Sequence, residues 1–315
     1  MQRGQKKNGG ESMCGGTLAG VDQLFYDWLE LDTGRLVKGI SADYGNTPAV
    51  AREICRQGPP EKSPPITEAF QAIQGNLDGA LKAGGRPPTE SNYRWEKQLN
   101  MQAHNSGEKR LEKLAACILG DDWVNQVPVC SGFTWAREGG RAIDLARKVS
   151  ESECQFIELK YAGQNSGRAG GADHPLYAAM ELLQYGLVFL MARKRSLIKA
   201  GGTRMYLNNV EKIQLVVLAP KEFYDGFEMQ WLPRVVNGGL AELRKQEELP
   251  VEMSLRFDVL SEEFISFYHQ LEDLMDDLRI VYENANIKSN DPGVDLAQSQ
   301  TNFRRLFPEY KNHFS

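Results

Sequence analysis

Two short segments that lie close together in the sequence carry side chains suited to phosphate chemistry. Asp144 lies in the first apolar run, and Glu158 and Lys160 lie in the second run, Phe156–Tyr161. Apolar and polar residues alternate in both runs, which is typical of strands. We therefore expect a β-hairpin with residues 150–153 at or near its tip.

The spacing within the second run predicts where its side chains point. Residues two apart on a strand share a face, so Glu158 and Lys160 point one way, while Ile157 and Leu159 point to the opposite face. If the hairpin places Asp144 across from Glu158, two carboxylates and an ammonium meet beside a hydrophobic sheet. Burying three charges is costly unless they pair with one another or bind a metal ion.

A pair of carboxylates with room for water suits Mg²⁺, which keeps part of its hydration shell in proteins. Such an ion can lower the pKa of a bound water and stabilise negative charge on a phosphate under attack. Lys160 would hold the nucleophilic water or offset the growing charge. These residues indicate metal-dependent phosphodiester hydrolysis. The alternative is a surface salt bridge between Lys160 and one of the acids, which contributes little to stability.

Asp144, thirteen intervening residues and then Glu158-Leu159-Lys160 resemble the PD-(D/E)xK nuclease superfamily. The resemblance implies an α/β fold with a restriction-endonuclease-like core, in which helices flank a central mixed β-sheet. It also implies that Asp144 and Glu158 bind Mg²⁺, for which Mn²⁺ can substitute, with the Leu159 carbonyl completing the shell. DNA is the substrate it suggests. One departure is that Ala142-Ile143 precedes Asp144, where a Pro often stands.

The same resemblance assigns roles to two neighbouring helices. A helix before the first core strand often supplies a further Glu, and here Glu108 and Glu112 compete. We favour Glu108, because a residue in the first helical turn after a Gly can approach the sheet edge. In many members a Gln on the helix after the ExK strand points at the active site, which indicates Gln184 as a residue that positions Lys160 or the water. A hydrogen-bonded core amide is the alternative for Gln184.

Composition narrows the class of protein. The chain has 315 residues, of which 41% are hydrophobic and 25% charged, so it can form one large domain or two smaller ones. Its five Cys include no CxxC pair, which argues against a zinc module and for a reducing compartment. We find no apolar signal-like start and no run of about 18 apolar residues, so we expect a cytoplasmic protein without a membrane span. The four scattered His residues exclude a His-based nuclease site.

Positive charge is concentrated around the proposed site. Residues 137–204 hold eleven Lys and Arg against seven Asp and Glu, whereas residues 205–315 hold eleven against nineteen. A phosphate-binding face requires such an excess, although a chance fluctuation is the alternative. Candidate nucleic-acid contacts are Arg141, Arg168 and Lys194.

Element patterns divide the chain into three regions. Residues 1–88 read as a mostly helical N-terminal region with a flexible start, 89–284 as the nuclease-like core, and 285–315 as a C-terminal tail. The N-terminal region could mediate assembly or target recognition, or simply pack on the core. Within it we expect helices at 21–31 and 67–82. In the core we expect helices at about 90–103, 108–119, 174–194, 229–246 and from Ser261, and strands at 123–133, 213–219 and 251–260.

Three local features refine these expectations. Pro128 lies within a strand and indicates an edge position or a bulge. Residues 163–172 are Gly-rich without a P-loop ending, so we expect a mobile loop beside the site. Asp173 can cap the next helix, with Pro175 in its first turn.

The sequence therefore predicts a Mg²⁺-dependent nuclease acting on nucleic acid, with DNA expected from the resemblance alone. Cleavage of both strands would favour a homodimer. Two other classes stay open: a catalytically inactive nucleic-acid-binding module, and an assembly subunit of a defence or mobile-element complex. Strandedness and sequence specificity are not determined by these patterns.

Overall fold

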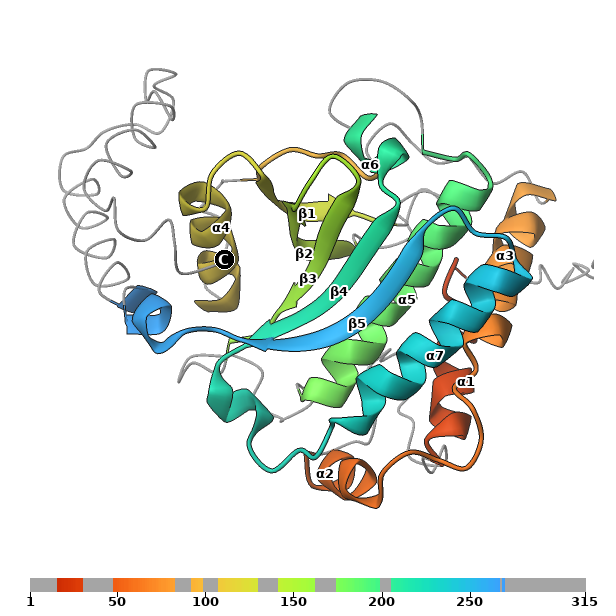
Figure 1. Cartoon of the computed structure of the whole chain (residues 1–315), viewed down its shortest axis with the longest axis horizontal. Helices are drawn as coiled ribbons and strands as arrows, with labels where there is room; N and C mark the ends of the chain where they lie inside the picture. Colours follow the sequence, from red (N-terminus) through yellow and green to blue (C-terminus); the bar gives the residue numbers. More distant parts are fainter. Residues whose placement is uncertain are drawn as a thin grey trace, which may run out of the picture.

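A mixed β-sheet forms the centre of the protein (Figure 1). Among the described residues it has five strands, in the order β1-β2-β3-β4-β5. The strands β1 to β3 pair antiparallel, and β3, β4 and β5 pair parallel. Their bounds are β1 Trp123–Pro128, β2 Ala142–Lys148, β3 Glu153–Leu159, β4 Lys212–Ala219 and β5 Glu252–Val259. The computed structural model describes residues 16–30, 48–82, 92–98, 107–129, 141–161, 174–198, 205–266 and 268–269.

Helices cover both faces of this sheet (Figure 1). The helix α4 (Gly107–Ile118) lies on one face, and α5 (Pro175–Lys194) and α7 (Trp231–Gln246) cross between parallel strands on the other face. Behind them lie α1 (Val21–Trp28) and α3 (Ile66–Lys82). Further helices in the described part of the chain are α2 (Pro48–Gln57), α6 (Met205–Asn209) and the 3-10 helix η4 (Lys221–Tyr224), and residues 262–266 and 268–269 are also helical. The α/β class with a central mixed sheet flanked by helices is thus confirmed.

The predicted hairpin is the antiparallel pair β2 and β3. Leu145 pairs with Ile157, and at the turn the Ser150 hydroxyl accepts hydrogen bonds from the backbone N–H groups of Ser152 and Glu153, at 3.3 and 3.1 Å. Such side-chain-to-backbone bonds are what favour Ser in turns. The turn of the hairpin therefore lies at residues 150–153, as the sequence predicts.

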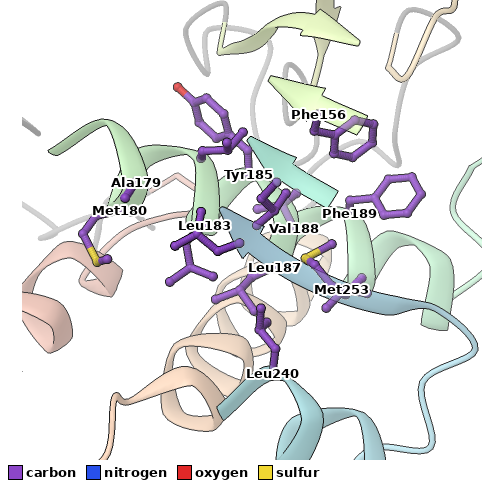
Figure 2. Close-up of a cluster of buried hydrophobic side chains, with 14 of the residues drawn as sticks. Phe156, Ala179, Met180, Leu183, Tyr185, Leu187, Val188, Phe189, Leu240 and Met253 are labelled. Carbon is purple, nitrogen blue, oxygen red and sulfur yellow. The ribbon is translucent and has the colours of Figure 1, made fainter. Parts of the chain in front are cut away.

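Helix α5 is the core of the larger layer. Its side chains pack between the sheet and the helices α3 and α7, with Phe189 edge-on to Phe156 of β3 at 5.2 Å between ring centroids (Figure 2). In the described part of the chain α5 alone is long and apolar enough to cross a membrane, but 89% of its apolar window is buried inside the protein. Core packing accounts for that composition.

One glycine permits the close approach of α5 to the sheet. A Cβ at Gly186 would lie 2.7 Å from the sulfur of Met253 and 3.0 Å from a methyl carbon of Leu215. Both contacts are shorter than side chains normally tolerate, so any larger residue at 186 would force these neighbours to move.

Two expectations about local structure are wrong, both next to the site. Residues 92–98 are not helical, because their backbone bonds to the outer edge of β1: the Tyr93 N–H donates to the Pro128 carbonyl at 2.7 Å. This edge position agrees with the Pro in β1. Helix α5 is capped by His174, whose Nδ1 accepts from the Tyr177 N–H at 3.2 Å, and Asp173 lies outside the described residues.

The described part of the N-terminal region packs on the core. Phe25 of α1 and Phe70 and Ile73 of α3 are fully buried in the same cluster as the side chains of α5 and α7. Of the alternatives for this region, packing against the core is the one seen for α1 and α3. The expected domain boundary at residue 88 lies outside the described residues.

This packing predicts that Phe70→Ala destabilises the whole protein. Removing a fully buried Phe costs about 3–5 kcal/mol, because the transfer energy is lost and a cavity remains. We expect a single cooperative unfolding transition that shifts by this amount in chemical denaturation. Leu81→Ala on the same helix, at a side chain 38% exposed, is the matched control and should change stability far less. A wild-type-like midpoint for Phe70→Ala would show that α3 is not part of the cooperative unit.

Candidate active site

The hairpin brings Asp144, Glu158 and Lys160 together. The pairing of β2 with β3 ends at Leu145 and Ile157, and Asp144 and Glu158 are the next residues along the two strands. The backbone N–H of Leu159 donates to Asp144 Oδ2 at 3.1 Å, so the Asp144 side chain is held against the end of β3. The three charged residues are only 6%, 4% and 5% exposed. They form a buried ionic site and not a surface salt bridge.

Lys160 is held between a carboxylate and an aromatic ring. Its Nζ lies 2.7 Å from Glu158 Oε1, and 6.0 Å from the ring centroid of Tyr177 in the first turn of α5. Glu158 and Lys160 therefore face α5, while Ile157 and Leu159 pack into the cluster beneath α4, as the alternation predicts. An ammonium fixed in this way can hold a water or a phosphate oxygen in a defined place.

Helix α4 adds a third carboxylate and a second lysine. Glu112 is completely buried, and Lys109 Nζ lies 2.7 Å from both Glu112 Oε2 and Asp144 Oδ1. Burial disfavours charge on the ammonium, but the two carboxylates outweigh it and raise the pKa of Lys109. One cation thus joins the helix to β2.

Two amides of β1 hold Glu112 in place. Asn125 Nδ2 donates to Glu112 Oε1 at 2.9 Å, and Gln126 Nε2 donates to Glu112 Oε2 at 2.8 Å. Asn125 also binds the backbone of Gln98 through both amide atoms, at 3.0 and 2.7 Å. Gln126 has a φ of 51°, a left-handed conformation that costs a non-glycine residue energy and recurs at functional sites. The edge strand β1 therefore fixes the orientation of the Glu112 carboxylate.

On the other side, α5 contributes Glu181 and Tyr185. The Tyr185 hydroxyl donates to Glu181 Oε1 at 2.8 Å, and the negative charge of Glu181 acts on Glu158. Gln184, the residue expected to point at the site, donates through Nε2 to Asp22 Oδ1 of α1 at 2.6 Å. That bond fastens α1 to α5. The role of Gln184 in positioning Lys160 remains a prediction.

Negative charge exceeds positive charge in this buried cluster. Burial, and then the charge of Asp144, raises the pKa of Glu158 well above its ordinary value, although Lys160 opposes the shift. Burial and Asp144 likewise raise the pKa of Glu112 from 4.5 to about 7. Three carboxylates (Glu112, Asp144 and Glu158) share two lysines here, so an additional cation would stabilise their ionised forms.

The donor set fits Mg²⁺ in the way that this ion usually binds proteins. Among the described residues no three Asp, Glu, His or Cys side chains converge on one metal position. Mg²⁺, however, is commonly held by one or two carboxylates, with waters and substrate phosphate completing its six ligands. Asp144 and Glu158 are hard oxygen donors of that kind, and the negative charge of Asp144 acts on Glu158.

Of the other expected site residues, some lie near the site and others lie far from it. Glu108 Oε2 accepts from the Tyr161 N–H at 3.3 Å, so it lies at the end of β3 but one helical turn from Glu112. Arg141 lies close enough to Tyr185 for its charge to act on the phenol. Lys194 pairs with Glu247 after α7. Seventeen residues separate Lys194 from Tyr177, about 25 Å along a helix, so Lys194 does not belong to the site. Arg168 and residues 163–172 lie outside the described residues.

Several residues that the sequence patterns did not single out also lie at the site. They are Lys109, Asn125, Gln126, Tyr177, Glu181 and Tyr185, and Glu112 was the less favoured of two glutamates. A signal existed for Lys109 and Glu112, because residues three apart on a helix share a face. None existed for the β1 amides, whose partners are distant in sequence.

Comparison of the chain with protein-family models, with curated proteins and with solved structures found no match.

The raised pKa of Glu112 predicts a specific dependence of stability on pH. Between about pH 4.5 and pH 7 the folded protein binds a proton at Glu112 more tightly than the unfolded chain does. Stability therefore falls as the pH rises through this range, by on the order of 2–3 kcal/mol. Glu158 contributes in the same direction.

Glu112→Gln should remove the part of this pH-dependent loss of stability that Glu112 causes. Chemical denaturation of wild type and variant at pH 5 and pH 8, without divalent cations, measures the difference. The control is Glu151→Gln, at a side chain that is 90% exposed, which should retain the wild-type difference between the two pH values. Equal pH dependence in all three proteins would show that Glu112 ionises normally.

Proposed function

We propose that this protein is a metal-dependent nuclease that hydrolyses phosphodiester bonds by means of a restriction-endonuclease-like core. The single observation that carries the proposal is the buried meeting of Asp144, Glu158 and Lys160 at the ends of β2 and β3. Such a group of charges costs folding free energy, and a purely structural hairpin does not need it.

The order of elements also supports the proposal. A helix, an edge strand, a strand with Asp144 and a strand with Glu158 and Lys160 follow one another as α4, β1, β2 and β3. This is the order that the resemblance to the PD-(D/E)xK superfamily predicts. Helix α5 then crosses to a central parallel strand, β4.

Each residue has a distinct task in this proposal. Asp144 and Glu158 would hold Mg²⁺ or Mn²⁺, with the Leu159 carbonyl as a further ligand. When bound there, such an ion would supply a lower pKa to a water and positive charge to the phosphate. Lys160, fixed by Glu158 and Tyr177, orients the attacking water or stabilises the developing negative charge.

The helix carboxylate of the site is best assigned to Glu112. Both Glu108 and Glu112 belong to α4, but Glu112 shares Lys109 and Gln126 with Asp144. Glu108 binds the backbone at Tyr161 instead. We therefore revise the preference for Glu108 and propose that it holds the end of β3.

Nucleic acid is the proposed partner, and the preference for DNA rests on the resemblance. Arg141 is the described cation that we assign to a phosphate near the site, because it directly precedes β2 and its charge acts on Tyr185. Two-strand cleavage would use a homodimer. The assembly-subunit alternative receives less support, since the described helices α1 and α3 of the N-terminal region are occupied with core packing.

The proposal predicts metal-dependent cleavage of plasmid or single-stranded DNA that depends on Lys160 and Asp144. Lys160→Ala and Asp144→Asn should each lower the rate by at least about a hundredfold, because each removes a group that acts directly at the reacting phosphate. Cleavage is measured with Mg²⁺, with Mn²⁺ and with chelator.

Lys212→Ala is the matched control, because Lys212 starts β4 and pairs with Glu153 by the hairpin turn. It should cleave like wild type. Salt-sensitive binding of DNA or RNA by wild type without cleavage would support the inactive binding module. Absence of both binding and cleavage would contradict the proposed function and leave the resemblance as an indication of the fold alone.

A further inference from the structure

The Lys109 ammonium lies where the oxygen atoms of two acidic side chains converge. It is 2.7 Å from Asp144 Oδ1 on β2 and 2.7 Å from Glu112 Oε2 on α4. Asp144 is also the residue to which we assign a metal-binding role. A lysine and a divalent cation would therefore share the same carboxylate.

The carboxylates that meet at Lys109 are held from other directions as well. Glu112 is fixed by Asn125 and Gln126, and Gln126 Nε2 lies 3.5 Å from Asp144 Oδ1. Asp144 Oδ2 is held by the Leu159 N–H. Departure of the ammonium would thus leave two oriented carboxylates close together, which is a preorganised position for a cation.

The two lysines of the site differ in how easily their ammonium groups can move from the carboxylates into water. The side chain of Lys160 is 7% exposed, whereas that of Lys109 is 28% exposed. A long side chain on a helix surface can keep its stem packed and swing its ammonium into water. Lys109 is therefore the lysine that can move when a second cation arrives.

We propose that Lys109 is a built-in counter-ion that leaves Asp144 when a divalent cation binds, and that Lys109 thereby weakens the cation affinity of the site. This inference rests on the proposed function only for the metal site at Asp144. Lys109 balances the buried carboxylates in the free protein and is repelled by the incoming ion. The ion must then replace an existing cation, so the site loads only where divalent cations are abundant.

Replacing Lys109 by an uncharged side chain of similar length tests this directly. Binding of Mn²⁺ to the full chain is titrated by electron paramagnetic resonance or calorimetry for wild type, Lys109→Met, Lys109→Arg and Asp144→Asn. Lys109→Met should bind Mn²⁺ at least about tenfold more tightly, because the competing charge is gone. Lys109→Arg should stay near wild type, and Asp144→Asn should lose the site. Equal or weaker binding by folded Lys109→Met would overturn the proposal.

A second measurement uses the wild-type protein, so it does not depend on the stability of a variant. Lysine labelling by an amine-reactive ester, read by mass spectrometry, reports how accessible each ammonium is. Addition of Mn²⁺ should increase labelling of Lys109 several-fold and leave Lys212 unchanged. Unchanged or decreased labelling of Lys109 at saturating Mn²⁺ would show that the lysine stays in place and contradict the proposal.

The outcomes separate this inference from the nuclease proposal. Tighter Mn²⁺ binding by Lys109→Met without nucleic-acid cleavage would support the counter-ion and reject the nuclease. Metal-dependent cleavage with unchanged Mn²⁺ affinity in Lys109→Met would reject the counter-ion alone. Absence of Mn²⁺ binding by both wild type and Lys109→Met would reject the counter-ion, whatever the cleavage assay shows.

Discussion

Burial of ionised carboxylates is the constraint on which the site depends. Asp144 and Glu158 are almost fully removed from water, and Glu112 is completely buried. Each is stabilised by directed contacts: a backbone N–H and Lys109 for Asp144, Lys160 for Glu158, and two amides and Lys109 for Glu112. Burial, and then the charge of Asp144, raises the pKa values of Glu112 and Glu158, because the two lysines do not fully offset these effects. A further cation would stabilise the ionised forms of these carboxylates.

The apolar core and the ionic site are parts of one packing arrangement. Helix α5 fills the core through Leu183, Leu187 and Phe189 (Figure 2). It reaches the site through Tyr177 and Glu181. A site built on a buried helix and two paired strands is rigid, which is what orientation of a reacting group requires. The helices α1 and α3 of the N-terminal region cover the far side of α5.

The two lysines of the site are embedded differently. Lys160 lies on a strand between Glu158 and an aromatic ring and has little exposure, so its position is fixed. Lys109 lies on a helix near solvent and binds two carboxylates from different elements. Fixed charge suits stabilisation of a reacting phosphate, whereas a lysine that can reach water suits exchange with another cation. This difference in burial is the reason for assigning them different tasks.

Local pattern determined much of this protein, and long-range packing decided the rest. Alternation in Phe156–Tyr161 predicted the hairpin and the opposite directions of Leu159 and Lys160, because strand side chains alternate whatever the strand pairs with. The apolar character of α5 likewise predicted a core helix. The different contacts of Glu112 and Glu108, the contact of Gln184 with Asp22 and the non-helical path of residues 92–98 depended on how α4, α1 and β1 lie against the sheet. Those contacts join residues distant in the sequence, and only the tertiary structure decides them.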